Sequence, residues 1–336
     1  MHSPRAFFVS LVSLVLGLSA AGAFAAPTPD SYVFTYFTKN GEDGLHLAWS
    51  RDGYTWEALN GGKSYLAPTV GQSKLMRDPC VLRGPDGTFH MVWTSGWNEN
   101  NIGYASSKDL IRWSAEKEIP VMAHEPTVRN CWAPEVAYDD KRGEFILFWA
   151  STIPEKSPKP DVAAKATGAV EGYRHKLYFT TTKDFVTFAP TKLFYDPGFS
   201  VIDATFLKAN GHNYLIVKDE TGKDDATHTE ARKYLQITQS DDMQGPFAAL
   251  SAPFTPKGLW SEGPTAIRIG DDYIVYFDAY TQKHYGALRS RDLKTWEDVT
   301  AKMSFPNEGT ELRMRHGTVI AVPAEIAAGL RQTAMP

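Results

Sequence analysis

Ser50-Arg51-Asp52-Gly53-Tyr54-Thr55-Trp56 follows the strand-like run LHLAW, and four later stretches of the chain repeat its pattern. Each copy pairs Ser or Thr with an Asp two positions later and an aromatic residue further on: Ser107-Lys108-Asp109 with Trp113, Thr182-Lys183-Asp184 with Phe188, Ser240-Asp241-Asp242 with Phe247, and Ser290-Arg291-Asp292 with Trp296. Short strands that repeat roughly every 50–75 residues are typical of a β-propeller. The sequence therefore predicts an all-β fold with five blades.

Each blade is predicted to have four strands, and the repeated Ser/Thr-x-Asp segment joins the third strand to the fourth. Asp and Ser side chains commonly satisfy backbone groups in tight turns, so we expect these segments to be structural turns on the back face. We expect the aromatic residue of each copy to pack between blades. Loops that enter the first strand, or join the second to the third, then share the front face.

The fifth blade is predicted to be shared by the two ends of the chain. The runs YVFTYF, LHLAWS and TWEAL near the N-terminus form a blade without its innermost strand, and the stretch from His316 to Val322 is a strand without a blade. Placing this C-terminal strand beside the N-terminal blade closes the ring and pairs edges that would otherwise be exposed.

The first 25 residues have the features of a secretory signal peptide. Arg5 is followed by the apolar run 6–18 and by the small-residue site Ala23-Phe24-Ala25. Cleavage there would leave one propeller domain over 26–336 and change the formal net charge from -4 to -5, because the removed segment carries Arg5 and no acid. We expect an exported monomer, periplasmic or extracellular. The absence of a basic patch argues against nucleic-acid or membrane partners.

Two cysteines, Cys80 and Cys131, occur in the whole sequence. A disulfide between them is compatible with export. Neither their spacing nor their neighbours indicate a metal site, and buried free thiols are the simpler expectation.

Polar residues occur near the start of each predicted innermost strand: Asp78, Glu135, Asp203, Glu262 and His316. Buried carboxylates without partners are costly, so five such residues at corresponding places indicate a functional cluster around the axis. Acids that crowd one pocket repel each other and separate their pKa values, which lets one donate a proton while another stays ionised. Cleavage of a glycosidic bond requires such a pair.

The ordered set of these segments resembles family 43 of the glycoside hydrolases, five-bladed propellers that hydrolyse arabinosides and xylosides with inversion. The matching segments are Arg77-Asp78-Pro79, Trp132-Ala133-Pro134-Glu135, Ile202-Asp203, Glu262-Gly263-Pro264 and His316-Gly317. The resemblance implies that Asp78 is the general base, Glu262 the general acid, and Asp203 the residue that raises the pKa of Glu262. The chain departs from the family pattern in Ala204, where proline is usual, and in Arg77, where alanine is common.

The resemblance further implies that His316 lies near the axis, where members of the family often hold a metal ion. No cofactor is required for the expected reaction, and an axial calcium or sodium ion is compatible with it. Front-face aromatic, arginine and acidic residues are the candidate sugar contacts: Trp97, Arg77, Trp132, Glu135, Trp260, Tyr280 and Arg289. The long front-face stretch 153–174 is a further candidate for contact with ligand.

The expected activity is exo-acting α-L-arabinofuranosidase on arabinose- or xylose-containing plant glycans, with β-xylosidase or galactofuranosidase as alternatives. A retaining fructosidase lacks support because its Asn-Asp-Pro-Asn motif is missing. A sialidase would need six blades and an arginine triad. A carbohydrate-binding propeller without catalysis is the alternative of another class, and the three filled carboxylate positions argue against it.

Overall fold

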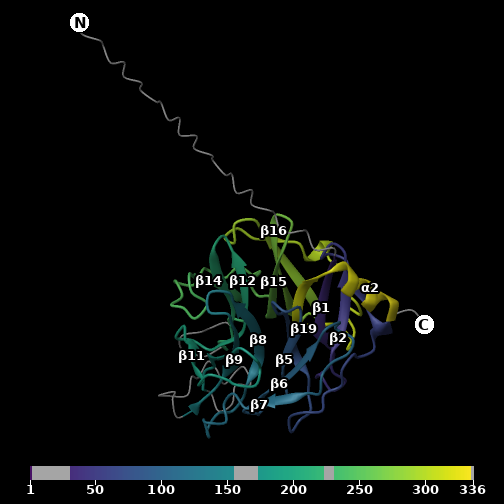
Figure 1. Cartoon of the computed structure of the whole chain (residues 1–336). Helices are drawn as coiled ribbons and strands as arrows, with labels where there is room; N and C mark the ends of the chain where they lie inside the picture. The colour runs from purple at the N-terminus through teal and green to yellow at the C-terminus, as the bar shows by residue number, and fades with distance from the viewer. Residues whose placement is uncertain (2–30, 155–172, 223–230, 334–336) are drawn as a thin grey trace.

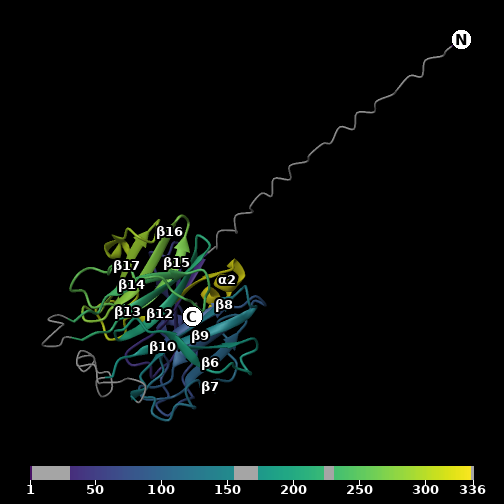
Figure 2. The same cartoon turned by 90° about the vertical axis from the view of Figure 1, so that its left-hand side faces the viewer.

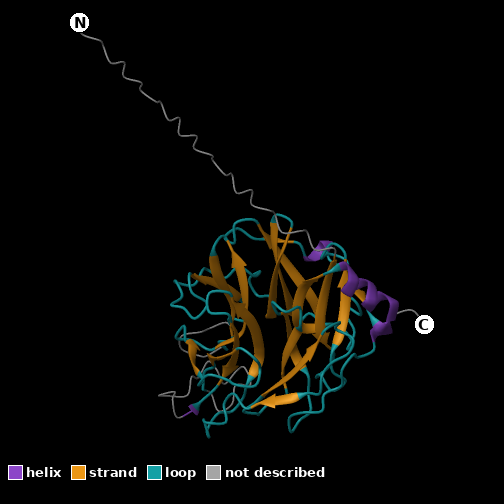
Figure 3. Cartoon of the chain, in the orientation of Figure 1, coloured by secondary structure: helices purple, strands orange, loops and turns teal. Residues whose placement is uncertain are grey.

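The computed structural model describes Met1 and residues 31–154, 173–222 and 231–333. Within these ranges the chain forms five antiparallel sheets arranged around a common axis, and strands dominate the structure (Figures 1 and 3). The predicted signal peptide and most of the long stretch 153–174 lie outside the described residues. No helix within the described part of the chain has the length and apolar character needed to cross a bilayer.

The sheets follow one another along the chain, and the strands of each blade run in order from the axis outward. The first blade contains β19 (Arg315–Val322), β1 (Ser31–Phe37), β2 (His46–Ser50) and β3 (Glu57–Ala58). The second contains β4 (Arg77–Arg83), β5 (Phe89–Thr94), β6 (Ile102–Ser107) and β7 (Lys117–Ile119). The third contains β8 (Trp132–Asp139), β9 (Glu144–Ser151), β10 (Lys176–Thr182) and β11 (Lys192–Tyr195).

The fourth blade contains β12 (Val201–Ala209), β13 (His212–Asp219) and β14 (Leu235–Ser240), and the fifth contains β15 (Glu262–Ile269), β16 (Asp272–Ala279), β17 (His284–Ser290) and β18 (Glu297–Asp298). Short 3-10 turns lie at Asn60–Gly62 and Thr300–Lys302, and helix α2 (Ala324–Thr333) packs against the first blade. Figure 2 shows the same blades from the side.

The ring closes as predicted. β19 pairs with β1 in antiparallel register, with Val33 opposite Ile320 and Ser31 opposite Val322. Each innermost strand also contacts the next around the axis: β4 with β8, β8 with β12, β12 with β15, β15 with β19, and β19 with β4. The two ends of the chain therefore complete one blade between them, and that blade has a partner on both sides.

The fourth blade differs from the prediction of four strands. The segment that follows β14 runs beside it and donates backbone hydrogen bonds from Ala248, Ser251 and Phe254, at 2.9, 2.9 and 3.1 Å, but it does not form a regular strand. Pro246, Pro253 and Pro256 interrupt this segment. Because proline cannot donate a ladder hydrogen bond, the outer edge of this blade is irregular.

The repeated turns have the predicted structural role. Ser50 Oγ accepts a hydrogen bond from Gly53 N at 2.8 Å, and Asp52 Oδ1 accepts from Tyr54 N and Thr55 N at 2.7 and 2.9 Å. The aromatic residue of each copy packs on the preceding blade, as Trp56 does on Tyr276 at 5.8 Å between ring centroids. Five clusters of buried apolar side chains form between neighbouring blades in this way within the described residues.

Both cysteines are buried and unpaired. Cys80 Sγ accepts a hydrogen bond from Val136 N at 3.4 Å, and Cys131 Sγ lies 3.8 Å from Ser151 Oγ. The expectation of buried free thiols is confirmed, and the alternative of a disulfide is wrong for this structure.

Candidate active site

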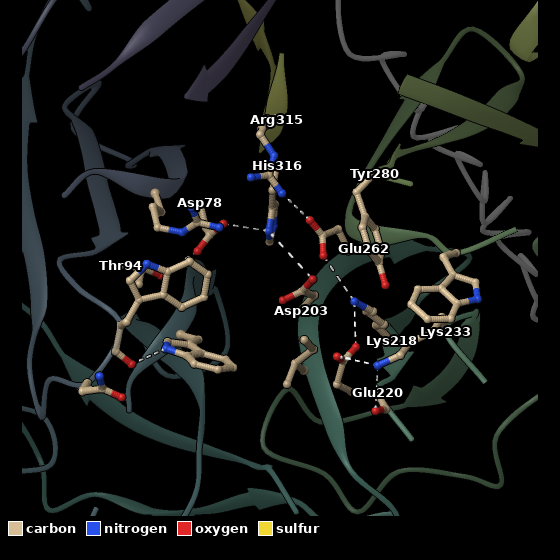
Figure 4. A pocket seen from close by; sticks show the side chains of 16 residues that line it. Asp78, Thr94, Asp203, Lys218, Glu220, Lys233, Glu262, Tyr280, Arg315 and His316 are labelled. Carbon is tan, nitrogen blue, oxygen red and sulfur yellow. Dashed lines mark hydrogen bonds and ion pairs between the residues drawn. The ribbon is translucent and has the colours of Figure 1, made fainter. Parts of the chain in front are cut away.

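A pocket of about 630 Å³ opens at the front of the ring. Its wall is built from the starts of the innermost strands and from the loops between second and third strands, as the strand order predicted (Figure 4). Asp78, Asp203, Glu262 and His316 all line this pocket, although up to 238 positions (316 − 78) separate them in the chain. Closure of the ring is what brings them together.

Every innermost strand starts with the same irregularity, a shift in pairing register over four residues. The four-residue starts are Arg77–Cys80, Trp132–Glu135, Ile202–Thr205, Glu262–Thr265 and Arg315–Thr318. Asp78, Asp203 and His316 share the second place in these starts, but Glu262 holds the first place and Glu135 the fourth. The prediction that all five polar residues occupy one equivalent position is therefore wrong.

The second place of the start has an unusual backbone. Asp78 and Asp203 adopt positive φ angles of 53° and 50°, which L-residues other than glycine seldom adopt, and Gly263 has a φ of 57°. Gly263 N donates to Asp203 Oδ2 at 2.9 Å, and a Cβ at Gly263 would lie only 2.3 Å from His316 Cγ. The bulged starts thus turn the acids toward the axis and leave room for His316 beside β15.

Asp78 is half-buried, and both of its carboxylate oxygens have partners. Thr94 Oγ1 donates to Oδ2 at 2.7 Å, and His316 Nδ1 lies 3.3 Å from Oδ1. Burial alone would raise the pKa of Asp78. The hydrogen bond and charge of His316, together with the charge of Arg77, outweigh burial and hold this pKa below its usual range. Asp78 is therefore ionised at neutral pH.

His316 lies between the acids, with Nδ1 at 4.0 Å from Asp203 Oδ2 (Figure 4). Burial lowers the pKa of His316, but Asp78 and Asp203 more than compensate and raise it to about 9. Burial raises the pKa of Asp203 to about 6, against the opposing charges of His316 and Lys218. At neutral pH the imidazolium form of His316 is thus favoured, and Asp203 titrates near the working pH of most enzymes.

Two cations hold Glu262. Arg315 Nη2 lies 2.8 Å from Oε1, and Lys218 Nζ lies 3.3 Å from Oε2. Burial acts to raise the pKa of Glu262, but the charges of Lys218, Arg315 and Arg77 outweigh it and lower the pKa. The expectation of a raised pKa for Glu262 is therefore wrong for the ligand-free protein, because sequence position did not reveal the two cations beside it.

Glu135 does not line the pocket. It is buried, and its Oε2 accepts a hydrogen bond from Thr205 Oγ1 at 3.1 Å. Thr205 lies two residues beyond Asp203 on β12. Burial raises its pKa to about 7. The prediction of Glu135 as a sugar contact is wrong, because its place two residues beyond Ala133 sets it deeper along the strand.

The predicted aromatic contacts and Arg77 do line the pocket. Trp97 and Trp132 meet edge to face at 5.6 Å between centroids, and Trp132 Nε1 donates to the carbonyl oxygen of Trp97 at 2.8 Å. Arg77 lies over the Trp97 ring at 4.3 Å. Trp260 and Tyr280, whose ring centroids are 6.0 Å apart, form a second aromatic wall.

Arg289 lies away from the pocket. Its guanidinium pairs with Glu297 at 2.5 Å and with Asp272 at 3.4 Å. It directly precedes the Ser290-Arg291-Asp292 turn, which the strand order had already placed on the back face. The prediction of Arg289 as a sugar contact is therefore wrong.

Sequence reasoning missed four charged residues of the pocket, namely Arg315, Lys218, Glu220 and Lys233. Arg315 starts β19 in the place that corresponds to Arg77, so comparing the strand starts residue by residue would have found it. Lys218 and Glu220 lie at the end of β13, where the loop to the third strand was expected on the front face. Lys233 has no sequence signal, because nothing local marks it as buried beside an acid.

The axial metal ion that the resemblance implied stays a prediction. His316 Nδ1 is directed at Asp78, and the cations Arg77, Arg315 and Lys218 line the same pocket. Within the described ranges, no group of three or more His, Cys, Asp or Glu side chains is arranged to hold a metal ion.

Comparisons with known proteins identify the family of the chain. A family model described as a probable glycosyl hydrolase domain, related to glycoside hydrolase family 43, matches residues 28–327. An α-L-arabinofuranosidase of Bifidobacterium longum subsp. longum is 23% identical over 371 aligned positions, which cover 89% of this chain and 34% of that protein. This chain thus spans about a third of the length of that relative.

Solved structures share the fold. That of an α-L-arabinofuranosidase from Lactobacillus brevis has a TM-score of 0.50 at 16% identity, covering 67% of this chain and 72% of that one. That of a xylan β-1,4-xylosidase from Bacillus halodurans C-125 has a TM-score of 0.52 at 14% identity, covering 70% and 44%. At these identities the likeness concerns the fold alone.

Proposed function

The chain belongs to the family of glycosyl hydrolase domains related to glycoside hydrolase family 43, and from this premise we propose that it is an inverting, exo-acting α-L-arabinofuranosidase. The observation that carries the proposal is the convergence of Asp78, Asp203 and Glu262 in one front-face pocket. The similarity to the Bifidobacterium longum arabinofuranosidase supports the choice of sugar.

Asp78 and Glu262 have complementary parts in the proposed reaction. They lie on opposite sides of His316 in the view of Figure 4, and inversion requires a separation that admits a water between the two carboxyl groups. Asp78 is ionised and acts as the general base that takes a proton from the attacking water. Glu262 donates a proton to the oxygen of the leaving group, so that the glycosidic bond breaks as the new C–O bond forms.

Glu262 must carry a proton for this role, although its two cations favour the carboxylate in the empty pocket. A bound sugar excludes water from the pocket, and desolvation favours the neutral form of a carboxyl group. Asp203, with its pKa of about 6, faces the same space and opposes a second negative charge beside it. In this proposal, binding of the sugar therefore favours the protonated form of Glu262.

The shape of the pocket supports exo action. A pocket of about 630 Å³ at the end of the ring accommodates a terminal sugar and the first part of its leaving group. We assign stacking on sugar faces to the walls Trp97–Trp132 and Trp260–Tyr280, and hydroxyl binding to Arg77. The proposed reaction requires no cofactor, because the protein's own acid and base carry the proton transfers.

The protein is proposed to act after export, in the periplasm or outside the cell, as a monomer on glycans that contain arabinose or xylose. The apolar run near the N-terminus supports export. Sequencing the N-terminus of the mature protein from the periplasm or medium tests this, and a start at Ala26 is the expected result.

The general acid is tested by Glu262→Gln, assayed on methyl α-L-arabinofuranoside, whose alkoxide leaving group needs a proton, with Glu57→Gln as the control. Glu57 is exposed on β3. We expect kcat/KM of Glu262→Gln to fall by about 100-fold or more, because the amide cannot donate the proton, and Glu57→Gln to match the wild type. Proton NMR of the first product should show an inverted anomer. Equal rates for Glu262→Gln and wild type would remove Glu262 from the mechanism, and cleavage of a xyloside or galactofuranoside instead would change the sugar.

A further inference from the structure

Charged side chains of alternating sign form a line with Glu262 in the middle, in the order Lys233, Glu220, Lys218, Glu262, Arg315, Asp278 and Arg313. The first five line the pocket, and the last two do not. On one side of Glu262, Lys218 Nζ lies 3.3 Å from Glu262 Oε2 and 2.7 Å from Glu220 Oε2. The other oxygen of Glu220 lies 2.7 Å from Lys233 Nζ (Figure 4). Glu220 therefore bridges the two lysines, and only one of them touches Glu262.

The line continues on the other side of Glu262. Arg315 Nη2 lies 2.8 Å from Glu262 Oε1, and Arg315 Nε lies 3.2 Å from Asp278 Oδ2. The second oxygen of Asp278 lies 2.9 Å from Arg313 Nη1. Each cation that touches Glu262 is thus shared with a second acid, Glu220 for Lys218 and Asp278 for Arg315.

Most members of this line are buried, and Glu262 and Arg315 are half-buried. Lys218 is 1% exposed and Asp278 is fully buried, and Glu220, Lys233 and Arg313 are buried as well. Burying an ion pair costs desolvation energy that the attraction of the pair often fails to repay, so stability alone is a weak reason for such a line. Its members come from the fourth, fifth and first blades and all converge on one carboxylate.

Other charged or titratable groups face Glu262 from the neighbouring strands and loops. They are Arg77 on β4, Asp203 on β12, His316 on β19 and Tyr280 after β16, besides the members of the line itself. Single substitutions within the line leave this background unchanged. Such variants differ in the strength of the net electrostatic stabilisation of the Glu262 carboxylate by Lys218 or Arg315.

We propose that Glu220 and Asp278 are positioning residues, which act through Lys218 and Arg315 to set the pH at which Glu262 holds its proton. The inference rests on the function proposed above, in which Glu262 is the acid. Without the charge of Glu220, Lys218 acts on Glu262 alone and favours the carboxylate. Without the charge of Lys218, Glu262 is protonated more readily. The two ends of one ion pair therefore have opposite effects on the same proton.

The test is the pH profile of kcat and kcat/KM for Glu220→Gln, Asp278→Asn and Lys218→Met. The alkaline limb reports loss of the acid's proton. We expect this limb to move to lower pH in Glu220→Gln and in Asp278→Asn. We expect it to move to higher pH by about one unit in Lys218→Met, since an opposite charge at this range lowers a carboxyl pKa by about one to three units. Lys108→Met, which removes an exposed pair with Asp86 on the back face, is the control and should leave both limbs in place.

If these residues served only to stabilise the fold, the variants would have lower kcat values, but the alkaline limbs of their pH profiles would stay at the same pH. The double variant Glu220→Gln/Lys218→Met should bring the limb back from the Glu220→Gln position, and it keeps the test usable if a single variant folds poorly. Limbs that stay at the wild-type pH, or that move in the same direction in Glu220→Gln and Lys218→Met, would overturn the inference. A wild-type protein that cleaves no glycoside at any pH would instead overturn the proposed function.

Discussion

At the scale of single residues, the ion pair between His316 and Asp78 links stability to pH. The pKa of His316 is raised from 6.5 to about 9. A raised pKa means that the folded state holds a proton that the unfolded chain has released, so the pair stabilises the fold fully below pH 6.5, and this contribution is lost as the pH rises through 9. The raised pKa corresponds to at most about 3 kcal/mol.

We therefore expect the wild type to lose its stability advantage over His316→Gln between pH 6.5 and 9. Urea unfolding of both proteins at pH 6, 7.5 and 9 measures this difference. The charge of His316 also lowers the pKa values of Asp203 and Glu135, so in His316→Gln both carboxyl groups keep their protons to higher pH, and their titration contributes to the difference between the two proteins. A constant difference across the three pH values would show that His316 is not charged in the folded state.

At the scale of elements, the bulged start of β15 depends on Gly263. A Cβ at Gly263 would lie only 2.3 Å from His316 Cγ, and the positive φ of 57° would strain an L-residue there. We expect Gly263→Ala to lower the free energy of unfolding by about 2–4 kcal/mol, as backbone strain of about 1 kcal/mol adds to overpacking of about 1–3 kcal/mol. Activity should fall as well, because His316 and Asp203 are displaced.

Gly270→Ala is the matched control for this element. Gly270 has a similar φ of 61°, but nothing lies within 4 Å of its Cβ direction, so only the backbone strain of about 1 kcal/mol is expected. Chemical denaturation of both variants separates the two contributions. Equal losses for the two variants would mean that the contact with His316 has no energetic weight.

At the scale of the whole molecule, β19 closes the ring and carries Arg315 and His316 into the pocket. Deleting residues 315–336 would leave the inner edge of β1 unpaired and separate the contacts of β19 with β4 and β15. We expect this deletion to abolish cooperative unfolding, because an open propeller exposes two blade faces and an unpaired strand edge.

Deleting only residues 324–336 is the control, because it removes α2 and keeps β19. Ala327 and Leu330 of α2 are buried against the first blade, so this variant should lose about 2–4 kcal/mol but still unfold in one transition. Thermal unfolding followed by near-ultraviolet circular dichroism distinguishes the two deletions. A sharp transition in the longer deletion would mean that the other four blades hold the fold without closure.

The sequence by itself determined the number of blades, the closing strand and the face on which the pocket lies, because turn chemistry and strand alternation repeat locally in every blade. It also identified Asp78, Asp203 and Glu262 as neighbours in space. Only the tertiary structure decided what surrounds them. The bulged starts set Glu135 and Glu262 at different depths, and the cations Lys218 and Arg315 reach Glu262 from other blades. A pKa depends on burial and on charges across the ring, which no local run of residues encodes.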